Sequence, residues 1–201
     1  MKRSVTAVSG RAAVLSRDDI DTDALFPAPY LRLTRRSGMG RYLFADWRAA
    51  GRPEVAFMAA AEAPRFLVGA ANFGCGSSRE QAVWALADYG VQAVLALSFG
   101  DIFRNNCVKN DLVAATLAAD DHATLLAALA ARPGAELRLD VASRSVQLPG
   151  DIDLPLVLVE GHAEQLLSAE DPIARTLHFT DALAGYEARV ATERPWLAAI
   201  D

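Results

Sequence analysis

One nine-residue segment carries residue types that bind and activate a small anionic molecule. It spans residues 72–80 and reads Asn-Phe-Gly-Cys-Gly-Ser-Ser-Arg-Glu. Gly74 and Gly76 remove side-chain bulk, so the backbone can turn tightly and a ligand can approach free amide groups at the start of a following helix. The positive end of that helix and the planar guanidinium of Arg79 favour a carboxylate there. The segment therefore predicts a site for a negatively charged ligand.

The two serines of this segment, Ser77 and Ser78, admit two roles. A hydroxyl beside a guanidinium at a helix start has its alkoxide form favoured by the nearby charge, so a serine could act as a base. The pairs Ser77 with Glu80 and Ser78 with Gln81 also fit a capping box, in which the hydroxyl only caps the helix. The sequence leaves both roles open.

Cys75 offers a rival chemistry, a thiol nucleophile at a strand-to-helix turn. The nucleophile elbow would need glycine in place of Phe73 and of Ser77, and a Walker motif would need Gly-Lys-Ser/Thr after the glycines. The chain has two cysteines and no Cys-x-x-Cys, whereas iron–sulfur clusters need three or four thiolates. We therefore expect two reduced thiols, no metal bound by this chain, and any cluster to come from another chain.

A second polar segment lies upstream, where three acidic residues precede a basic loop. Asp19, Asp21 and Asp23 resemble the start of a calcium loop, but the glycine and the distal glutamate are missing at the required offsets. The loop that follows contains the only local concentration of positive charge: Arg32, Arg35, Arg36 and Arg41. Composition alone favours a solvated loop for these arginines.

Composition and patterning describe the scaffold that must position these residues. The 201 residues are 52% hydrophobic with a net charge of -5, which argues against nucleic-acid binding. The amino end lacks a continuous apolar stretch, so we expect a cytoplasmic protein without a membrane segment. Short apolar runs bounded by Gly, Pro or Asn predict strands at 4–15, 66–71, 92–97, 136–141 and 154–159. Helical patterns occupy 78–88, 121–131 and 180–193.

These elements intermix, which predicts an α/β fold with right-handed connections between parallel strands. The turn signals Pro133-Gly134 and Pro149-Gly150 enclose a predicted hairpin. We expect one domain over 1–201, with a core over about 1–160 and a C-terminal helical extension over about 161–201.

Several motifs in the same order resemble the small subunits of 3-isopropylmalate dehydratases, which are similar to the swivelling domain of aconitases. They are residues 72–80, Asp21-Thr22-Asp23, Leu43-Phe44-x-Asp46-Trp47-Arg48, the run from Trp84 to Gly90, and Ser98-Phe99-x-Asp101-Ile102-Phe103. The resemblance implies a swivelling β/β/α domain with a C-terminal helical tail. It also implies a large partner subunit that carries a [4Fe-4S] cluster, in a heterodimer or a dimer of heterodimers.

The same resemblance implies roles for individual residues in a hydro-lyase that isomerises 2-isopropylmalate and 3-isopropylmalate in leucine biosynthesis. Ser77 would be the base, and Ser78 and Arg79 would hold carboxylate oxygens. Arg32 or Arg36 would help to recognise the substrate, and Asp23 would orient groups nearby. The cationic Arg32 also suits an extra carboxylate, so hydratases of methylmalate (citraconate), dimethylmaleate or homoaconitate remain alternatives. An alternative of another class is a non-catalytic carboxylate-binding module.

Overall fold

The computed structural model describes residues 3–33, 35–77 and 79–197. The described chain divides into two compact units, one from Arg3 to Ser168 and one that begins at Ala169. The first unit contains every strand and the site described below, and the second contains only helices and a 3₁₀ turn.

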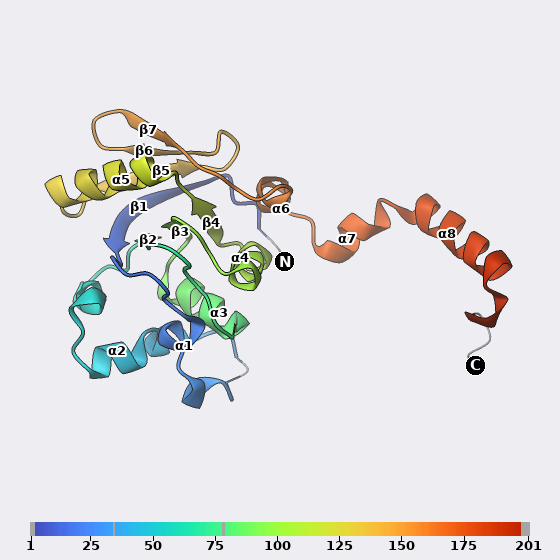
Figure 1. Cartoon of the computed structure of the whole chain (residues 1–201), viewed down its shortest axis with the longest axis horizontal. Coiled ribbons are helices and arrows are strands. Elements are labelled where there is room, and N and C mark those ends of the chain that lie inside the picture. The colour runs from blue at the N-terminus through green and yellow to red at the C-terminus, as the bar shows by residue number, and fades with distance from the viewer. Residues whose placement is uncertain (1–2, 34, 78, 198–201) are drawn as a thin grey trace. The chain divides into compact units, whose positions relative to one another are not determined.

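A seven-stranded mixed sheet forms the frame of the first unit (Figure 1). Its strand order is β4-β3-β2-β1-β5-β6-β7; β1 to β4 pair in parallel, and β1, β5, β6 and β7 pair antiparallel. The strands are β1 (Ala7–Val14), β2 (Phe66–Val68), β3 (Ala93–Ala96), β4 (Val113–Thr116), β5 (Glu136–Asp140), β6 (Ser145–Leu148) and β7 (Ile152–Pro155). Strand β1 therefore joins a parallel half to an antiparallel half.

The sheet is curled, because its two ends meet. Thr116, at the end of β4, pairs with Val157, two residues after β7, through two backbone hydrogen bonds of 3.0 and 2.8 Å. Hydrophobic residues fill two separate cores, one on each face of the sheet.

Strand β2 contributes side chains to both cores. Leu67 faces the first core and its neighbours Phe66 and Val68 face the second, because side chains alternate along a strand. All three side chains are fully buried, as parallel strands covered on both faces require. In β5 only Leu137 and Leu139 are buried, which leaves the other face of the antiparallel half exposed.

Six α-helices accompany the sheet in the first unit: α1 (Thr22–Leu25), α2 (Ala45–Ala49), α3 (Glu80–Tyr89), α4 (Asp101–Lys109), α5 (Ala119–Ala131) and α6 (His162–Leu167). Residues of α1, α2, α3 and α4 contribute to the first core, and residues of α5 and α6 to the second. Figure 1 shows α1, α2 and α3 below β2 and β3, with α5 above them. The 3₁₀ turns are Ala28–Tyr30, Gly40–Tyr42 and Pro53–Ala59.

The α/β prediction is confirmed, and so is the hairpin, which β5 and β6 form. Each predicted strand and helix overlaps an observed one, although β2 ends at Val68, before the predicted end at residue 71. No strand was predicted at β4 and no helix at α1, α2 or α4, and β6 was predicted only as part of the hairpin.

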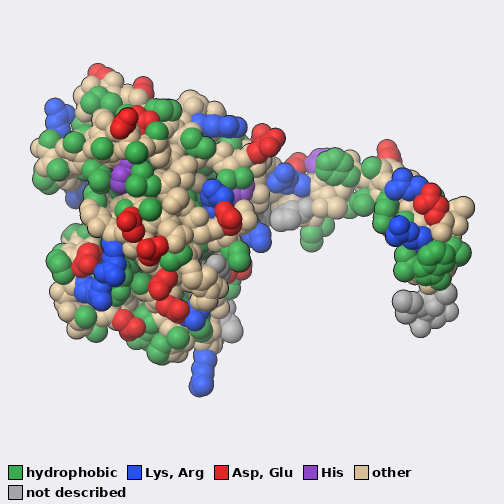
Figure 2. All heavy atoms as spheres, in the orientation of Figure 1, with side chains coloured by type: hydrophobic (Ala, Val, Ile, Leu, Met, Phe, Trp, Pro, Cys, Tyr) green, Lys and Arg blue, Asp and Glu red, His purple; other side chains and the backbone are tan. Residues whose placement is uncertain are grey.

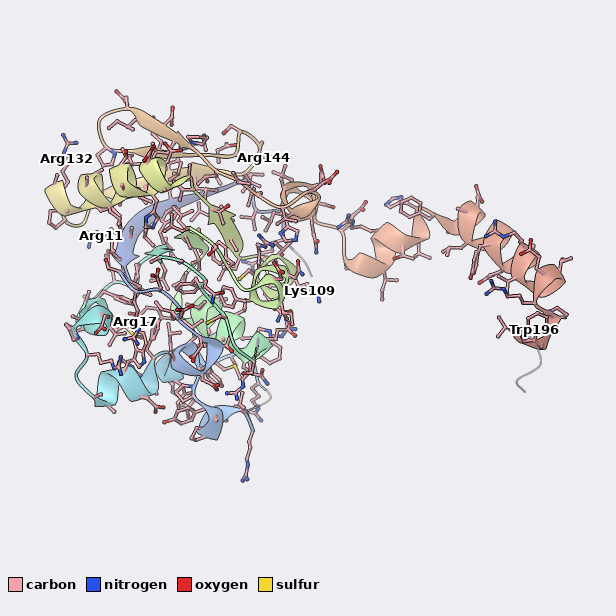
Figure 3. All side chains as sticks on the ribbon, in the orientation of Figure 1. Arg11, Arg17, Lys109, Arg132, Arg144 and Trp196 are labelled. Atoms are coloured by element: carbon pink, nitrogen blue, oxygen red, sulfur yellow. The ribbon has the colours of Figure 1, made fainter. Side chains whose placement is uncertain are left out.

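The second unit contains α7 (Pro172–Leu177), α8 (Thr180–Glu193) and the 3₁₀ turn Pro195–Leu197. Helix α8 buries none of its residues, and Trp196 is 68% exposed (Figures 2 and 3). The first unit extends to Ser168 because α6 buries Ala163 and Leu166, whereas the predicted extension begins near residue 161. Among the described helices, none has the length and apolar character that crossing a membrane requires.

Candidate functional site

The site residues lie on loops that follow β1, β2 and β3 at the carboxyl edge of the parallel half. The Gly74 amide donates to the Ile20 carbonyl (2.7 Å), and the Thr22 amide donates to the Cys75 carbonyl (3.0 Å). The Phe73 amide donates to the Ser98 carbonyl (3.0 Å). In open α/β sheets, ligands bind outside the carboxyl ends of strands, so these hydrogen bonds hold together the loops of a candidate site.

Two glycines give the loop after β2 its path. Gly74 and Gly76 have φ values of +73° and +83°, a region that residues with side chains rarely adopt. A Cβ atom on Gly74 would lie 2.6 Å from Cδ2 of Phe103 and even closer to Cγ of the same ring. The loop therefore passes directly over α4, and no side chain larger than hydrogen fits at position 74.

Ser77 is exposed beyond these glycines, and its hydroxyl lies 3.5 Å from the hydroxyl of Thr22. The capping box through Ser77 does not form: α3 starts at Glu80, its N-cap is Arg79, and no side chain caps it. The Glu80 carboxylate instead accepts a hydrogen bond from the side-chain amide of Asn110 (2.9 Å). The Ser77 hydroxyl therefore does not cap helix α3. Ser78 lies outside the described residues.

Asp23 and Arg79 come together next to Ser77. A carboxylate oxygen of Asp23 forms an ion pair with a terminal guanidinium nitrogen of Arg79, and the side chains are 50% and 22% exposed. The guanidinium has five donors in a planar fork, so a pair through one nitrogen is compatible with a second carboxylate. The arrangement can orient Arg79 toward an anionic ligand.

The two predicted recognition arginines lie in different places. Arg32 lines a cavity of about 330 Å³ together with Arg35 and Arg41. The guanidinium of Arg36 lies over the Trp84 ring of α3, 4.7 Å from its centroid. Arg32 therefore lies in a hollow of the loop among other arginines, whereas a cation–π contact holds Arg36.

The arginine loop, residues 32–41, is hydrogen-bonded to the C-terminal end of α3. The two carboxylate oxygens of Asp88 accept hydrogen bonds from the amides of Gly38 (3.1 Å) and Gly40 (2.8 Å). A Cβ atom on Gly40 would lie 2.7 Å from the Tyr89 nitrogen, so the loop backbone rests against the helix end. Helix α3 thus positions the arginine loop at its end and the Ser77 segment at its start.

The surroundings of Cys75 work against a thiol nucleophile. Burial is the main cause that raises the thiol pKa, and the charges of Asp21 and Asp19 raise the pKa further. The thiolate is the reactive form, so the site disfavours it.

The three aspartates upstream do not converge on a cation. Asp19 accepts a hydrogen bond from the side-chain amide of Asn72 (2.7 Å), and Asp21 caps α1 through the Ala24 amide (2.6 Å). Asp23 pairs with Arg79. Each carboxylate therefore has a separate partner, which agrees with the pattern mismatch to a calcium loop.

Comparisons with known proteins agree with this geometry. Residues 2–120 match the family model of the aconitase C-terminal domain. The 3-isopropylmalate dehydratase small subunit of Anaeromyxobacter sp. (strain K) is 47% identical over 150 residues, 72% of this chain and 76% of the relative. That of Psychromonas ingrahamii is 36% identical over 192 residues, 92% of this chain and 94% of the relative. The chain belongs to the aconitase C-terminal domain family, among the 3-isopropylmalate dehydratase small subunits.

A solved structure extends the likeness to three dimensions. The crystal structure of 3-isopropylmalate dehydratase (leuD) from Methanocaldococcus jannaschii matches with a TM-score of 0.65 and 26% identity. The match covers 90% of this chain and 99% of that chain.

The residues of this family member do not fit an iron–sulfur cluster of its own. Cys107 is fully buried and Cys75 is partly buried, and two thiols are fewer than a cluster needs. Among the described residues, no group of three or more His, Cys, Asp or Glu side chains is placed to hold a metal ion.

Thr22 was not predicted as a site residue. It lies in the Asp21-Thr22-Asp23 motif, in which only Asp23 was given a role at the site. Its closeness to Ser77 depends on pairing between segments 55 residues apart, so no local pattern indicates it.

Proposed function

We propose that this chain is the small subunit of a hydro-lyase that interconverts 2-isopropylmalate and 3-isopropylmalate in leucine biosynthesis. The observation that carries the proposal is the exposed Ser77 hydroxyl, which lies next to the Asp23–Arg79 ion pair in a member of this family. A serine and an arginine at the carboxyl edge of a parallel sheet supply a base and a carboxylate receptor to one ligand.

In the proposed reaction, Ser77 removes the proton from the carbon next to a substrate carboxylate. The hydroxyl group leaves from the neighbouring carbon as the double bond forms, and rehydration in the other orientation completes the isomerisation. Arg79 holds a carboxylate through its planar fork, and Asp23 fixes the direction of that fork. Ser78 would add a hydroxyl to the same carboxylate.

Recognition of the rest of the substrate falls to the arginine loop in this proposal. Arg32 lines the 330 Å³ cavity and can contact an anionic group, while Arg36, held against Trp84, positions the loop beside α3. Both arginines are proposed here as determinants of which diacid is accepted.

The proposed enzyme needs a large partner subunit. We assign the [4Fe-4S] cluster to that subunit, where it would supply a Lewis acid for the substrate hydroxyl and carboxylate. The present chain supplies the proton acceptor and the carboxylate receptor.

The test is anaerobic reconstitution with the large subunit encoded in the same genome, followed by absorbance of the alkene, which rises when a hydroxy diacid is dehydrated and falls when an alkene diacid is hydrated. 3-Isopropylmalate, citramalate-type diacids, dimethylmaleate and homoaconitate are compared side by side. We expect turnover of 3-isopropylmalate and a loss of at least about 10²-fold in kcat for Ser77→Ala, the usual size of a general-base contribution. Ser143→Ala is the control, because the Ser143 hydroxyl donates a hydrogen bond to the Asp140 carboxylate in the turn after β5, outside the proposed site.

The possible outcomes separate the alternatives. Preferential turnover of another diacid would keep the mechanism and change the substrate. An assembled complex with a loaded cluster and no turnover of any diacid would favour a carboxylate-binding module. Unchanged turnover by Ser77→Ala would remove Ser77 as the base.

A further inference from the structure

We propose that Thr22 is the positioning residue of Ser77, and that its hydroxyl donates a hydrogen bond to the Ser77 oxygen as that oxygen gains negative charge. The inference rests on the proposed function, since it assumes that Ser77 acts as a base. It assigns to Thr22 a role beyond packing.

The backbone around Thr22 is held on both sides. Its amide donates to the Cys75 carbonyl (3.0 Å), and its carbonyl accepts from the Phe26 amide (2.9 Å). Asp21 and Cys75 form a parallel bridge immediately before it. These contacts join the start of α1 to the Ser77 segment. The backbone therefore holds the hydroxyls of Thr22 and Ser77 close to each other.

The side chain of Thr22 is fully buried, yet its hydroxyl lies within hydrogen-bond reach of an exposed serine. Thr22 has no exposed surface, and its hydroxyl is 3.5 Å from that of Ser77, 55 residues away in the sequence. Thr22 is the first residue of α1, so no turn of that helix precedes it to accept a hydrogen bond from this hydroxyl. The buried hydroxyl is shielded from competing water and lies within reach of the proposed base.

The 3.5 Å separation fits a contact that tightens during the reaction. An ordinary hydroxyl–hydroxyl hydrogen bond is about 2.7 Å long, so the contact is loose while Ser77 is neutral. Either hydroxyl can donate in that state. A deprotonated Ser77 can only accept, and a charge-assisted hydrogen bond is shorter and stronger than a neutral one. Thr22 would then favour the charged form of Ser77.

The charges near Ser77 favour a donor that carries no charge of its own. Asp23 follows Thr22 directly, and its carboxylate would oppose negative charge on Ser77. The ion pair with Arg79 offsets that carboxylate. A neutral donor at Thr22 adds stabilisation of the alkoxide without introducing another charge.

The experiment compares Thr22→Val and Thr22→Ser in the reconstituted two-subunit enzyme. Valine keeps the shape and removes the hydroxyl, and serine restores the hydroxyl. We expect Thr22→Val to lower kcat by about 10²-fold, as loss of one aligned donor does in other active sites, with KM changed less than about threefold. Thr22→Ser should recover most of kcat. The control is Thr124→Val, which removes a hydroxyl that donates a hydrogen bond to the backbone carbonyl of Asp120 on α5. This variant should behave like the wild type.

Each result supports or overturns the positioning role of Thr22. Wild-type kcat for Thr22→Val would overturn the inference, as would equal losses in Thr22→Val and Thr22→Ser. A loss that accompanies a lower melting temperature or weaker subunit assembly, and that serine does not rescue, would assign Thr22 to structure alone. Ser77→Ala, measured in parallel, separates the two proposals: active Ser77→Ala defeats the base assignment, whereas inactive Ser77→Ala with active Thr22→Val defeats only the role of Thr22.

Discussion

Replacement of Gly74 by alanine gives the most direct test of the loop geometry. The new Cβ atom meets the Phe103 ring, and the backbone is held at φ +73°. The left-handed conformation costs about 1–2 kcal/mol for a residue with a Cβ atom. Overpacking against a buried ring costs about 1–3 kcal/mol more. We therefore expect Gly74→Ala to lower the free energy of unfolding by about 2–5 kcal/mol.

The control is Gly134→Ala, which isolates the backbone contribution. Gly134 has φ +81°, and no atom lies within 4 Å of the position where its Cβ would be. This variant should lose only about 1–2 kcal/mol. The assay is urea unfolding of both variants with equal m-values, supported by melting temperatures, which fall about 2–4 °C per kcal/mol in a chain of this size. Equal losses in the two variants would refute the close approach of the loop to α4.

Three further predictions concern the edges of the site. Asp23→Asn should change the free energy of unfolding by less than about 1 kcal/mol, because the ion pair is partly exposed, yet lower kcat/KM at least about tenfold in steady-state assays. Asp88→Ala should destabilise the chain by about 1–3 kcal/mol and raise KM, because two loop amides lose their acceptor; normal KM would contradict this anchoring role. Cys75 should react with iodoacetamide more slowly than free cysteine at pH 7.5 and faster as pH rises, because its pKa is raised and less thiolate is present. Mass spectrometry over time would measure this rate.

The sequence predicted the elements that have a clear apolar pattern. Strands β2 and β3 are short, fully apolar runs, and α5 has the length and periodicity of a helix. Strand β4 was missed because Val113–Thr116 is a short run of small residues between helical patterns. Helix α4 was missed because Asn105 and Asn106, which favour turns, interrupt its apolar positions.

The candidate site could be predicted only in part, for a different reason. Gly74, Gly76 and Arg79 lie within one segment, so their local roles follow from residue type and spacing. The hydroxyl partner of Ser77 and the cation–π contact of Arg36 with Trp84 depend on how distant segments pack. Such pairings are set by the folded backbone, and one sequence without its fold does not reveal them.

The place of β1 in the sheet has a consequence for the order in which the protein can fold. This strand is central but is synthesised first, and its neighbours β2 and β5 emerge only at residues 66–68 and 136–140. Pairing over such sequence separations is slow, because long loops must close before contacts compensate for their entropy. A growing chain that ends before residue 136 exposes one side of β1 as an unpaired strand edge, which can pair with other chains. Chaperone protection is therefore most needed before the β5–β6 hairpin is made.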